Sequence, residues 1–374
     1  MLRRTRPSPT PTTRPSPVGW SRAGAVAAAA GAAVLALATA APAAATGTPT
    51  GEPPEVPGLV VYASDTDVDA TAQAVQDALS ANGMVTAVLD HQENAASVGM
   101  ELRPTTLVVG GAPPVGTPLL QASQRAGVDL PQKFLAWEDE AGDVWLGYNS
   151  AEHVAVQAGL PADDPTTEAL ATASATIAAA ASGSEEPATE GAPVEELDGY
   201  LADRPSDAAD VDAAIARYQE ATTSAGLSQV ALVDHAAAAA SIGEVLRPTQ
   251  VLLAGNPAAG TPLIQAAQTM GIDLPTRYLA WEDESGQVRV GNVDVGALAR
   301  RHGVEDVSTL AMVRQATAGF TAAAAGGMVA PEGGVDTGAG GAVGGVDDAS
   351  WLLPAGLALL AAGGAVLVAR RRVG

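Results

Sequence analysis

Two Asp-His dipeptides carry the side chains of this chain best suited to chemistry. They are Asp90-His91 and Asp234-His235, and a carboxylate beside an imidazole can serve acid–base catalysis or bind a metal. Adjacent strand residues point to opposite faces, so the two side chains share a site only if the preceding strand has already ended. In that case each aspartate can instead cap the following helix, and Glu93 would complete a capping box in the first copy. The spacing favours the structural role.

Further polar residues accompany the dipeptides. Arg103 and Arg247 are scarce cations in an acidic chain, and each is expected to pair with a carboxylate of its own Asp-His or Trp-Glu-Asp segment. Asn256 follows a predicted strand, where polar groups gather at the mouth of a sheet. The candidate ligand-binding residues are Asp234, His235, Arg247, Asn256, Glu282, Asp90, His91 and Arg103. We expect the second copy to hold the site, with the first copy degraded or structural, and we assign no catalytic residue, metal site or cofactor.

These residues recur because the chain contains a tandem duplication. Residues 90–147 return as residues 234–291 at a constant offset of 144, and 32 of the 58 aligned positions are identical. Each copy is therefore expected to fold as one unit. Duplicated domains with matching surfaces can form a two-fold contact within one chain, so we expect the copies to pack on each other as a pseudo-dimer.

The local patterns predict an α+β architecture of two tandem two-layer α/β repeats. Short apolar runs bounded by Pro and Gly are typical of buried strands, and apolar residues at helical spacing predict helices on the sheet. In the first copy, Thr117 and Pro118 read as N-cap and N1 of a helix that ends at Gly127. The predicted elements of that copy are strands at 59–62, 85–89, 106–109, 134–137 and 144–147, and helices at 67–82, 117–126 and 166–181.

The recurring motifs resemble the domain-of-unknown-function 302 family of bacteria. They are Asp-His, Leu-Arg-Pro-Thr, Gly-Asn-Pro, Gly-Thr-Pro-Leu, Asp-Leu-Pro, Trp-Glu-Asp and Gly-x-Val. The second copy matches more fully, because it keeps Asn256 and His302 where the first copy has Ala112 and Ala158. The resemblance covers both repeats and implies a compact α+β domain in each, with no established activity.

The chain ends indicate export and anchoring. Five arginines and no acidic residue precede an apolar run at 23–41, as in a secretory signal peptide. Residues 351–369 carry no charge and would span about 28 Å as a helix, and the three arginines that follow favour the cytoplasmic side. The expected order is signal peptide 1–45, first repeat 57–182, linker 183–197, second repeat 198–325, glycine-rich stalk 326–350, transmembrane helix 351–369 and cytoplasmic tail 370–374.

Charge and cysteine content exclude several classes of function. All 42 acidic residues lie between the two apolar segments, and 8 of the 19 basic residues lie in the tails, which leaves 11 basic residues in the outer portion. Nucleic acid and anionic lipid surfaces are poor partners for a domain of that charge. The chain has no cysteine, so disulfides, thiol catalysis and thiolate metal sites are excluded.

We expect a single-pass protein with its repeats on the outer face of the cell membrane. Two hypotheses of different class follow for its function. We favour a non-catalytic module of the bacterial envelope that binds a small ligand or an envelope protein. The alternative is an extracytoplasmic hydrolase or isomerase that uses Asp, His and Glu side chains of the second repeat. Loss of Asn and His in the first copy, while its scaffold motifs survive, favours the first hypothesis.

Overall fold

A computed structural model describes residues 51–305 and 307–327 of the chain. The expected signal peptide, transmembrane segment and cytoplasmic tail, and residues 328–350 of the expected stalk, lie outside these ranges. Within the two ranges, no helix combines the length and the apolar character needed to cross a bilayer.

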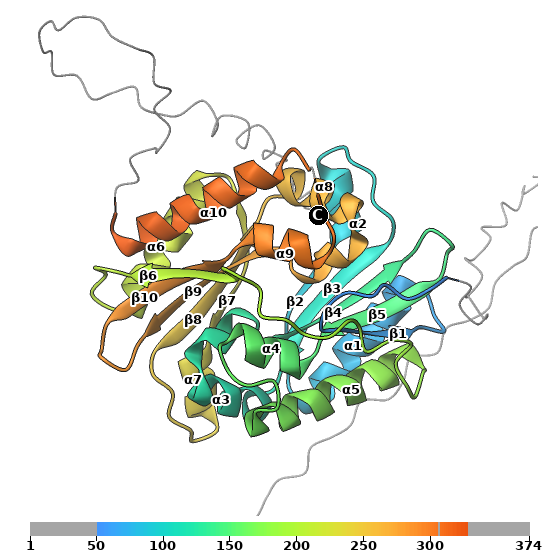
Figure 1. Ribbon diagram of the computed structural model, residues 1–374, viewed down its shortest axis with the longest axis horizontal. Helices are drawn as coiled ribbons and strands as arrows, with labels where there is room; N and C mark the ends of the chain where they lie inside the picture. Colours follow the sequence, from blue (N-terminus) through green and yellow to red (C-terminus); the bar gives the residue numbers. More distant parts are fainter. Residues whose placement is uncertain (1–50, 306, 328–374) are drawn as a thin grey trace, which may run out of the picture. The chain divides into compact units, whose positions relative to one another are not determined.

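The first repeat is a five-stranded antiparallel sheet with helices (Figure 1). Its strand order is β1-β5-β4-β3-β2. The strands are β1 (Leu59–Ala63), β2 (Met84–Asp90), β3 (Thr105–Gly111), β4 (Gln132–Glu138) and β5 (Val144–Asn149). The helices are α1 (Val68–Asn82), α2 (His91–Ser97), α3 (Pro113–Ala122), α4 (Ala151–Gln157) and α5 (Glu168–Ser182), with the 3-10 helices η1 (Gln124–Val128) and η2 (Pro165–Thr167).

The second repeat has the same topology, with strand order β6-β10-β9-β8-β7. Its strands are β6 (Leu201–Pro205), β7 (Ser228–Asp234), β8 (Thr249–Gly255), β9 (Thr276–Glu282) and β10 (Val288–Val293). Its helices are α6 (Val211–Ser224), α7 (His235–Ser241), α8 (Pro257–Ala266), α9 (Val295–Arg301) and α10 (Leu310–Ala325), with the 3-10 helix η3 (Gln268–Ile272). The prediction of two tandem α/β repeats is confirmed.

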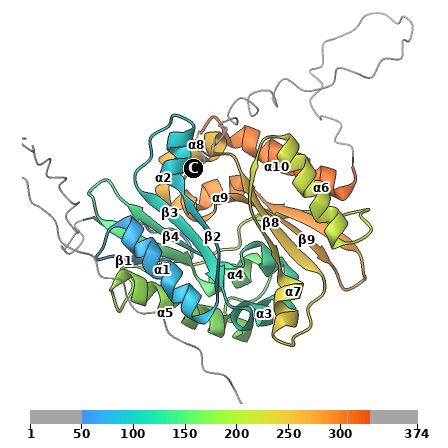
Figure 2. The ribbon, with the colours of Figure 1, turned by 180° about the vertical axis from the view of Figure 1, so that it is seen from behind.

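Each sheet buries both of its faces. In β1, Val60 and Tyr62 belong to a core shared with α1 and α5, whereas Leu59 and Val61 belong to a second core. Because side chains alternate along a strand, this division places α1 and α5 on one face only. Figure 2 shows α1 lying along strands of the first sheet, and α6 lies against β8 in the second repeat.

The other faces of the two sheets form one common core. Leu107 and Leu135 of the first repeat and Val251 and Leu279 of the second repeat belong to the same buried apolar cluster, and each is fully buried. A sheet face with no helix layer of its own must bury its apolar side chains against another element. The repeats therefore pack on each other within the chain, as the duplication predicts.

The linker between the repeats follows the edge strand β1. Val61 forms an isolated antiparallel bridge with Thr189, and the amide of Gly58 donates to the carbonyl of Ala192 at 3.0 Å. The Ser/Glu/Pro/Gly composition of residues 182–193 predicts a linker without regular structure. That interpretation is wrong for this bridge, because the free edge of β1 supplies hydrogen-bonding partners that composition does not reveal.

The helix after β3 begins earlier than predicted. α3 starts at Pro113 with Ala112 as N-cap in extended conformation, and Pro118 lies inside the helix. Proline is tolerated in the first turn, where its missing N–H has no intrahelical partner, so Pro113 can take the N1 position expected for Pro118. The helix also ends at Ala122, and Gly127 lies in η1 instead of following the helix.

Candidate functional site

The histidines of the two Asp-His dipeptides each reach into the opposite repeat. The Nε2 atom of His91 lies 3.0 Å from the carbonyl oxygen of Gly271, and that of His235 lies 3.0 Å from the carbonyl oxygen of Gly127. A carbonyl oxygen can only accept, so each ring donates from Nε2. Burial lowers the pKa of each histidine to about 4, although the carbonyl and the neighbouring aspartate oppose this. Both rings are therefore neutral at pH 7 and join the repeats.

Glycine leaves room for these rings at the positions that receive them. A Cβ atom on Gly127 would lie 3.1 Å from His235 and 3.1 Å from Leu279, and one on Gly271 would lie 3.3 Å from His91. These separations are tighter than ordinary van der Waals contact. Gly127 and Gly271 occupy the same position in the two copies, and each leaves room for the imidazole of the other repeat.

The aspartates of the dipeptides cap helices, as the spacing favours. Asp90 accepts a hydrogen bond from the amide of Glu93, and Asp234 accepts one from the amide of Ala237, both at 2.8 Å. Each carboxylate therefore faces its own helix while the adjacent ring enters the other repeat. The arrangement forms no Asp-His dyad in either dipeptide, because the partner of each imidazole is a backbone carbonyl.

The two arginines also bind across the repeat boundary. Arg103 donates from Nε to the side-chain oxygen of Gln268 at 3.2 Å, and Arg247 donates from Nε to that of Gln124 at 2.9 Å. Each arginine also approaches the glutamate that directly follows its Trp-Glu-Asp segment, instead of a carboxylate within the predicted segments, and these contacts are exposed: Arg103 to Glu140 at 3.4 Å and Arg247 to Glu284 at 3.9 Å. Exposed ion pairs contribute little to stability, so the hydrogen bonds to the glutamines are the contacts by which these arginines join the repeats.

The remaining candidates lie apart from one another. Asn256 is the N-cap of α8, where its side chain accepts from the amide of Ala258 at 2.9 Å. Glu282 ends β9 and is half-buried. His235 lines a cavity of the first repeat, whereas Asn256 and His91 line a groove of the second. The structure thus distributes the expected second-copy set over both repeats.

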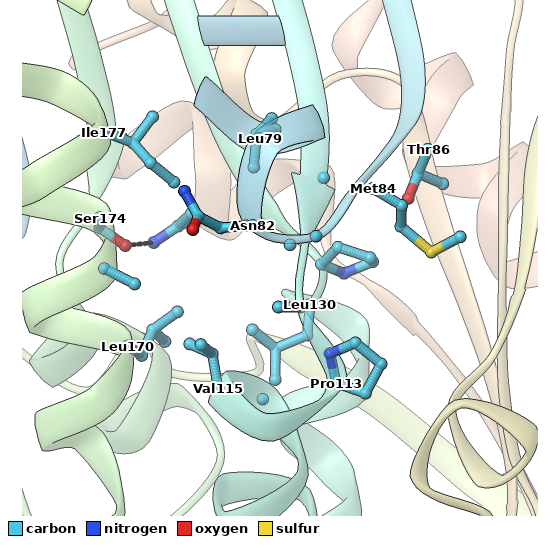
Figure 3. Close-up of a pocket in the computed structure, with 18 of the residues that line it drawn as sticks. Leu79, Asn82, Met84, Thr86, Pro113, Val115, Leu130, Leu170, Ser174 and Ile177 are labelled. Carbon is cyan, nitrogen blue, oxygen red and sulfur yellow. Dashed lines mark hydrogen bonds between the residues drawn. The ribbon is translucent and has the colours of Figure 1, made fainter. Parts of the chain in front are cut away.

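A cavity that the sequence patterns do not single out lies in the first repeat. We call it the repeat-1 cavity; its volume is about 330 Å³. It runs from Leu170 and Ile177 of α5, past Leu130, to Met84 at the start of β2, and Val233 and His235 of the second repeat complete its wall (Figure 3). Its volume lies at the lower end of the range for small-molecule sites, about 300 to 1,000 Å³.

The corresponding space in the second repeat is smaller and divided. Two grooves of about 110 and 40 Å³ lie there, and Val313 of α10 lines both. Tyr278 stands at the position of Phe134, and Phe320 at the position of Ile177 when the helix ends are aligned. Tyr278 and Phe320 pack edge to face with ring centres 6.0 Å apart. These larger aromatic side chains fill the space that stays open in the first repeat.

A buried ionic cluster joins the repeats beside the shared core. Asp273 contacts Arg277 at 3.1 Å, Arg301 at 3.0 Å and His302 at 3.0 Å. Arg301 also donates to the side chain of Asn149 in the first repeat at 2.8 Å. Although burial opposes ionisation, Arg277, His302 and Arg301 hold the pKa of Asp273 well below its ordinary value.

The first repeat supplies the other half of this ionic cluster. Asp129 contacts Lys133 at 3.0 Å and Arg277 at 3.4 Å, and accepts from the hydroxyl of Tyr200 at 2.8 Å. Burial and the nearby Arg277 lower the pKa of Lys133 to about 8. These side chains are at most 3% exposed, so a substrate cannot reach them and they hold the repeats together. Across residues 51–305 and 307–327, no group of three or more His, Asp or Glu side chains could hold a metal ion.

Sequence reasoning missed the cavity because its wall is made of ordinary core residue types. Leu79, Leu120 and Phe134 have the spacing of residues that pack between a helix and a sheet, and no polar signature marks them. The useful signal is a difference between aligned copies. Ile177 aligns with Phe320, and this difference in side-chain volume at one core position indicates that the two interiors differ.

The two sheets, each with its helix layer, and the reciprocal histidines define a tandem α/β repeat protein. The chain belongs to the family described as Domain of unknown function DUF302, which matches residues 60–180 and 203–323. The resemblance stated from the motifs is thereby confirmed. A solved structure titled "Crystal structure of uncharacterized conserved protein DUF302 from Bacillus stearothermophilus" is 14% identical, with a TM-score of 0.30, and the match covers 34% of this chain and 98% of that one.

Curated relatives match part of the chain. A protein named "Fluoride-specific ion channel FluC 1" from Brucella suis biovar 1 (strain 1330) is 43% identical over 115 residues, which are 30% of this chain and 45% of that protein. A protein of the same name from Brucella abortus biovar 1 (strain 9-941) is also 43% identical over 115 residues, or 42% of its length. The chain therefore spans less than half the length of these relatives.

Proposed function

We propose that this chain is a non-catalytic binding module and that its ligand site is the repeat-1 cavity. The observation that carries the proposal is the difference between the repeats: a cavity of about 330 Å³ in the first, against grooves of about 110 and 40 Å³ in the second. A void of that size lined by apolar groups forfeits packing contacts, so it costs stability unless a ligand fills it. The site proposed here lies in the first repeat, whereas the polar motifs led us to expect it in the second.

The polar candidates support binding indirectly. His235 lines the repeat-1 cavity while its ring bonds to Gly127, so the second repeat serves as part of the wall. Asp90, Asp234, Arg103 and Arg247 are occupied by caps and by contacts between the repeats. Side chains held in this way do not favour the alternative of a hydrolase or isomerase, which needs acid–base groups within reach of a substrate.

Closing the cavity is expected to abolish binding. Ile177→Phe introduces the side chain that Phe320 contributes in the second repeat, and it would lie against Phe134 as Phe320 lies against Tyr278. The probe is N-phenyl-1-naphthylamine, an uncharged dye that fluoresces in apolar surroundings, titrated into the full-length chain in lipid nanodiscs with empty nanodiscs subtracted. We expect saturable binding to the unmodified chain and at least tenfold weaker binding to the variant.

The matched control is Phe320→Ile, which enlarges the groove of the second repeat and leaves the repeat-1 cavity unchanged. Dye affinity of the first repeat should not fall in this variant. Equal dye binding by the unmodified chain and by Ile177→Phe would contradict the proposal, provided that both unfold at similar temperature.

We further propose that the repeats lie outside the cytoplasm and are anchored by residues 351–369. Support comes from the basic flanks of the two apolar segments, both of which favour the cytoplasmic side. Protease added to intact protoplasts is expected to remove the repeats and leave a small membrane-bound fragment. Protection of the repeats in intact protoplasts, with digestion after lysis, would overturn this topology.

A further inference from the structure

Among the residues that the structure describes, no charged side chain lines the repeat-1 cavity. Its lining is dominated by leucine, valine, alanine, proline and glycine, and His235, the one titratable residue on it, is neutral at pH 7 because burial lowers its pKa to about 4. Moving an ion into such surroundings costs several kcal/mol unless a partner of opposite charge is present. The cavity is therefore matched to an uncharged molecule.

Ser174 is one of the buried hydroxyl residues that line this wall. Ser174 of α5 is 1% exposed, and its oxygen accepts a hydrogen bond from Nε2 of Gln132 at 2.9 Å (Figure 3). Both N–H groups of the Gln132 amide are used, because the same nitrogen donates to the carbonyl of Asn149 at 3.0 Å, and its oxygen accepts from the amide of Lys133 at 3.0 Å. Among the described residues, the hydroxyl hydrogen of Ser174 has no acceptor. A hydroxyl that accepts from one side can donate on the other.

The same positions of the second repeat are satisfied internally. Thr317, which aligns with Ser174, donates to the carbonyl of Arg314 at 3.0 Å. Thr276, which aligns with Gln132, donates to the carbonyl of Ala254 at 2.7 Å. A buried donor without a partner costs about 1 to 3 kcal/mol, and at these two aligned positions the second repeat avoids that cost while the first does not. The unpaired donor and the open space thus occur together in one repeat.

We propose that the repeat-1 cavity takes an uncharged, mainly apolar molecule whose single acceptor oxygen receives a hydrogen bond from the Ser174 hydroxyl. This inference rests on the proposed function and adds the chemical class of the ligand: a ketone, ester, ether or amide on an alkyl chain or small ring. The apolar part lies along Leu170, Ile177 and Leu130 toward Met84, a residue that is 59% exposed at the start of β2. An exposed apolar side chain at that end is suited to an apolar ligand entering there.

The test compares ligands matched in length. The probes are 2-octanone, octanoate and octylammonium at pH 7.5, and cyclohexane as an apolar molecule without an acceptor, each titrated calorimetrically into the full-length chain in nanodiscs with Ile177→Phe as blank. The unmodified chain is expected to bind 2-octanone at least tenfold more tightly than either ion. Ser174→Ala is expected to weaken 2-octanone binding about fivefold, the effect of one hydrogen bond, and to leave cyclohexane binding unchanged.

Two controls separate the outcomes. Thr317→Ala removes the aligned hydroxyl of the second repeat and should not change the affinity for 2-octanone, and cyclohexane binding verifies that each variant keeps its cavity. If octanoate binds as tightly as 2-octanone, or if Ser174→Ala retains full affinity for the ketone, the ligand class is wrong while the binding module stands. If no probe distinguishes the unmodified chain from Ile177→Phe, the proposed function itself fails.

Discussion

Replacing Asp273 with alanine is expected to destabilise the chain by about 3 to 5 kcal/mol, the cost of leaving a buried charge without its partner. Asp273 is fully buried and contacts Arg277, Arg301 and His302 at 3.0 to 3.1 Å. Its removal leaves two guanidinium groups in the interior with one remaining carboxylate, that of Asp129. Urea unfolding of the full-length chain, followed by the fluorescence of the buried tryptophans, measures the change.

The matched control is Asp163→Ala, because Asp163 is exposed. Surface substitutions of that kind usually change stability by no more than about 0.5 kcal/mol. Asp273→Asn should lie between the two, since an amide keeps hydrogen bonding but loses the charge. A loss below about 1 kcal/mol in Asp273→Ala would show that the ionic cluster does not hold the repeats together.

Acid is expected to separate the repeats through His91 and His235. Each ring has a pKa of about 4 when folded, against 6.5 when exposed, so the unfolded chain binds more protons between these values. Stability is therefore complete above about pH 6.5 and falls as the pH drops toward 4. The slope is at most about 1.4 kcal/mol per pH unit for each histidine, or nearly 3 kcal/mol per unit for the pair.

His91→Gln combined with His235→Gln provides the comparison, because an amide can donate to the same carbonyl without titrating. We expect the free energy of unfolding of this variant to fall less steeply between pH 6.5 and 4 than that of the unmodified chain. Burial also lowers the pKa of His153 and His302, so a residual slope in the variant is expected. Identical slopes in the two proteins would assign the acid sensitivity elsewhere.

The sequence predicts elements well where one strong pattern governs a segment. The strand at 106–109 became β3 and the helix at 67–82 became α1, because periodicity and caps agree there. Where two signals compete, the prediction failed: both Pro113 and Pro118 can begin a helix, and only tertiary packing selects the first. Packing of the repeats on each other was predictable from the duplication itself.

The candidate site was harder to predict, for a physical reason. Polar motifs such as Asp-His attract functional interpretations, yet here they satisfy helix ends and join repeats. A cavity, by contrast, arises where side chains leave space between them unfilled. Leu130 or Ile177 looks the same in the sequence whether or not another side chain packs against it. In the sequence, only the comparison of aligned core positions, such as Ile177 with Phe320, carries that information.

The reciprocal insertion of His91 and His235 has a consequence for how such a protein can change. In an assembly of two identical chains, a substitution that opens one interior opens both, and each partner bears the same loss of packing. Here the joining contacts are duplicated, but the two repeats lie in one chain and each aligned position is a separate residue. Ser174 and Thr317, or Ile177 and Phe320, can therefore differ. One repeat can then keep a tightly packed interior that stabilises both, while the other loses packing contacts and has a cavity.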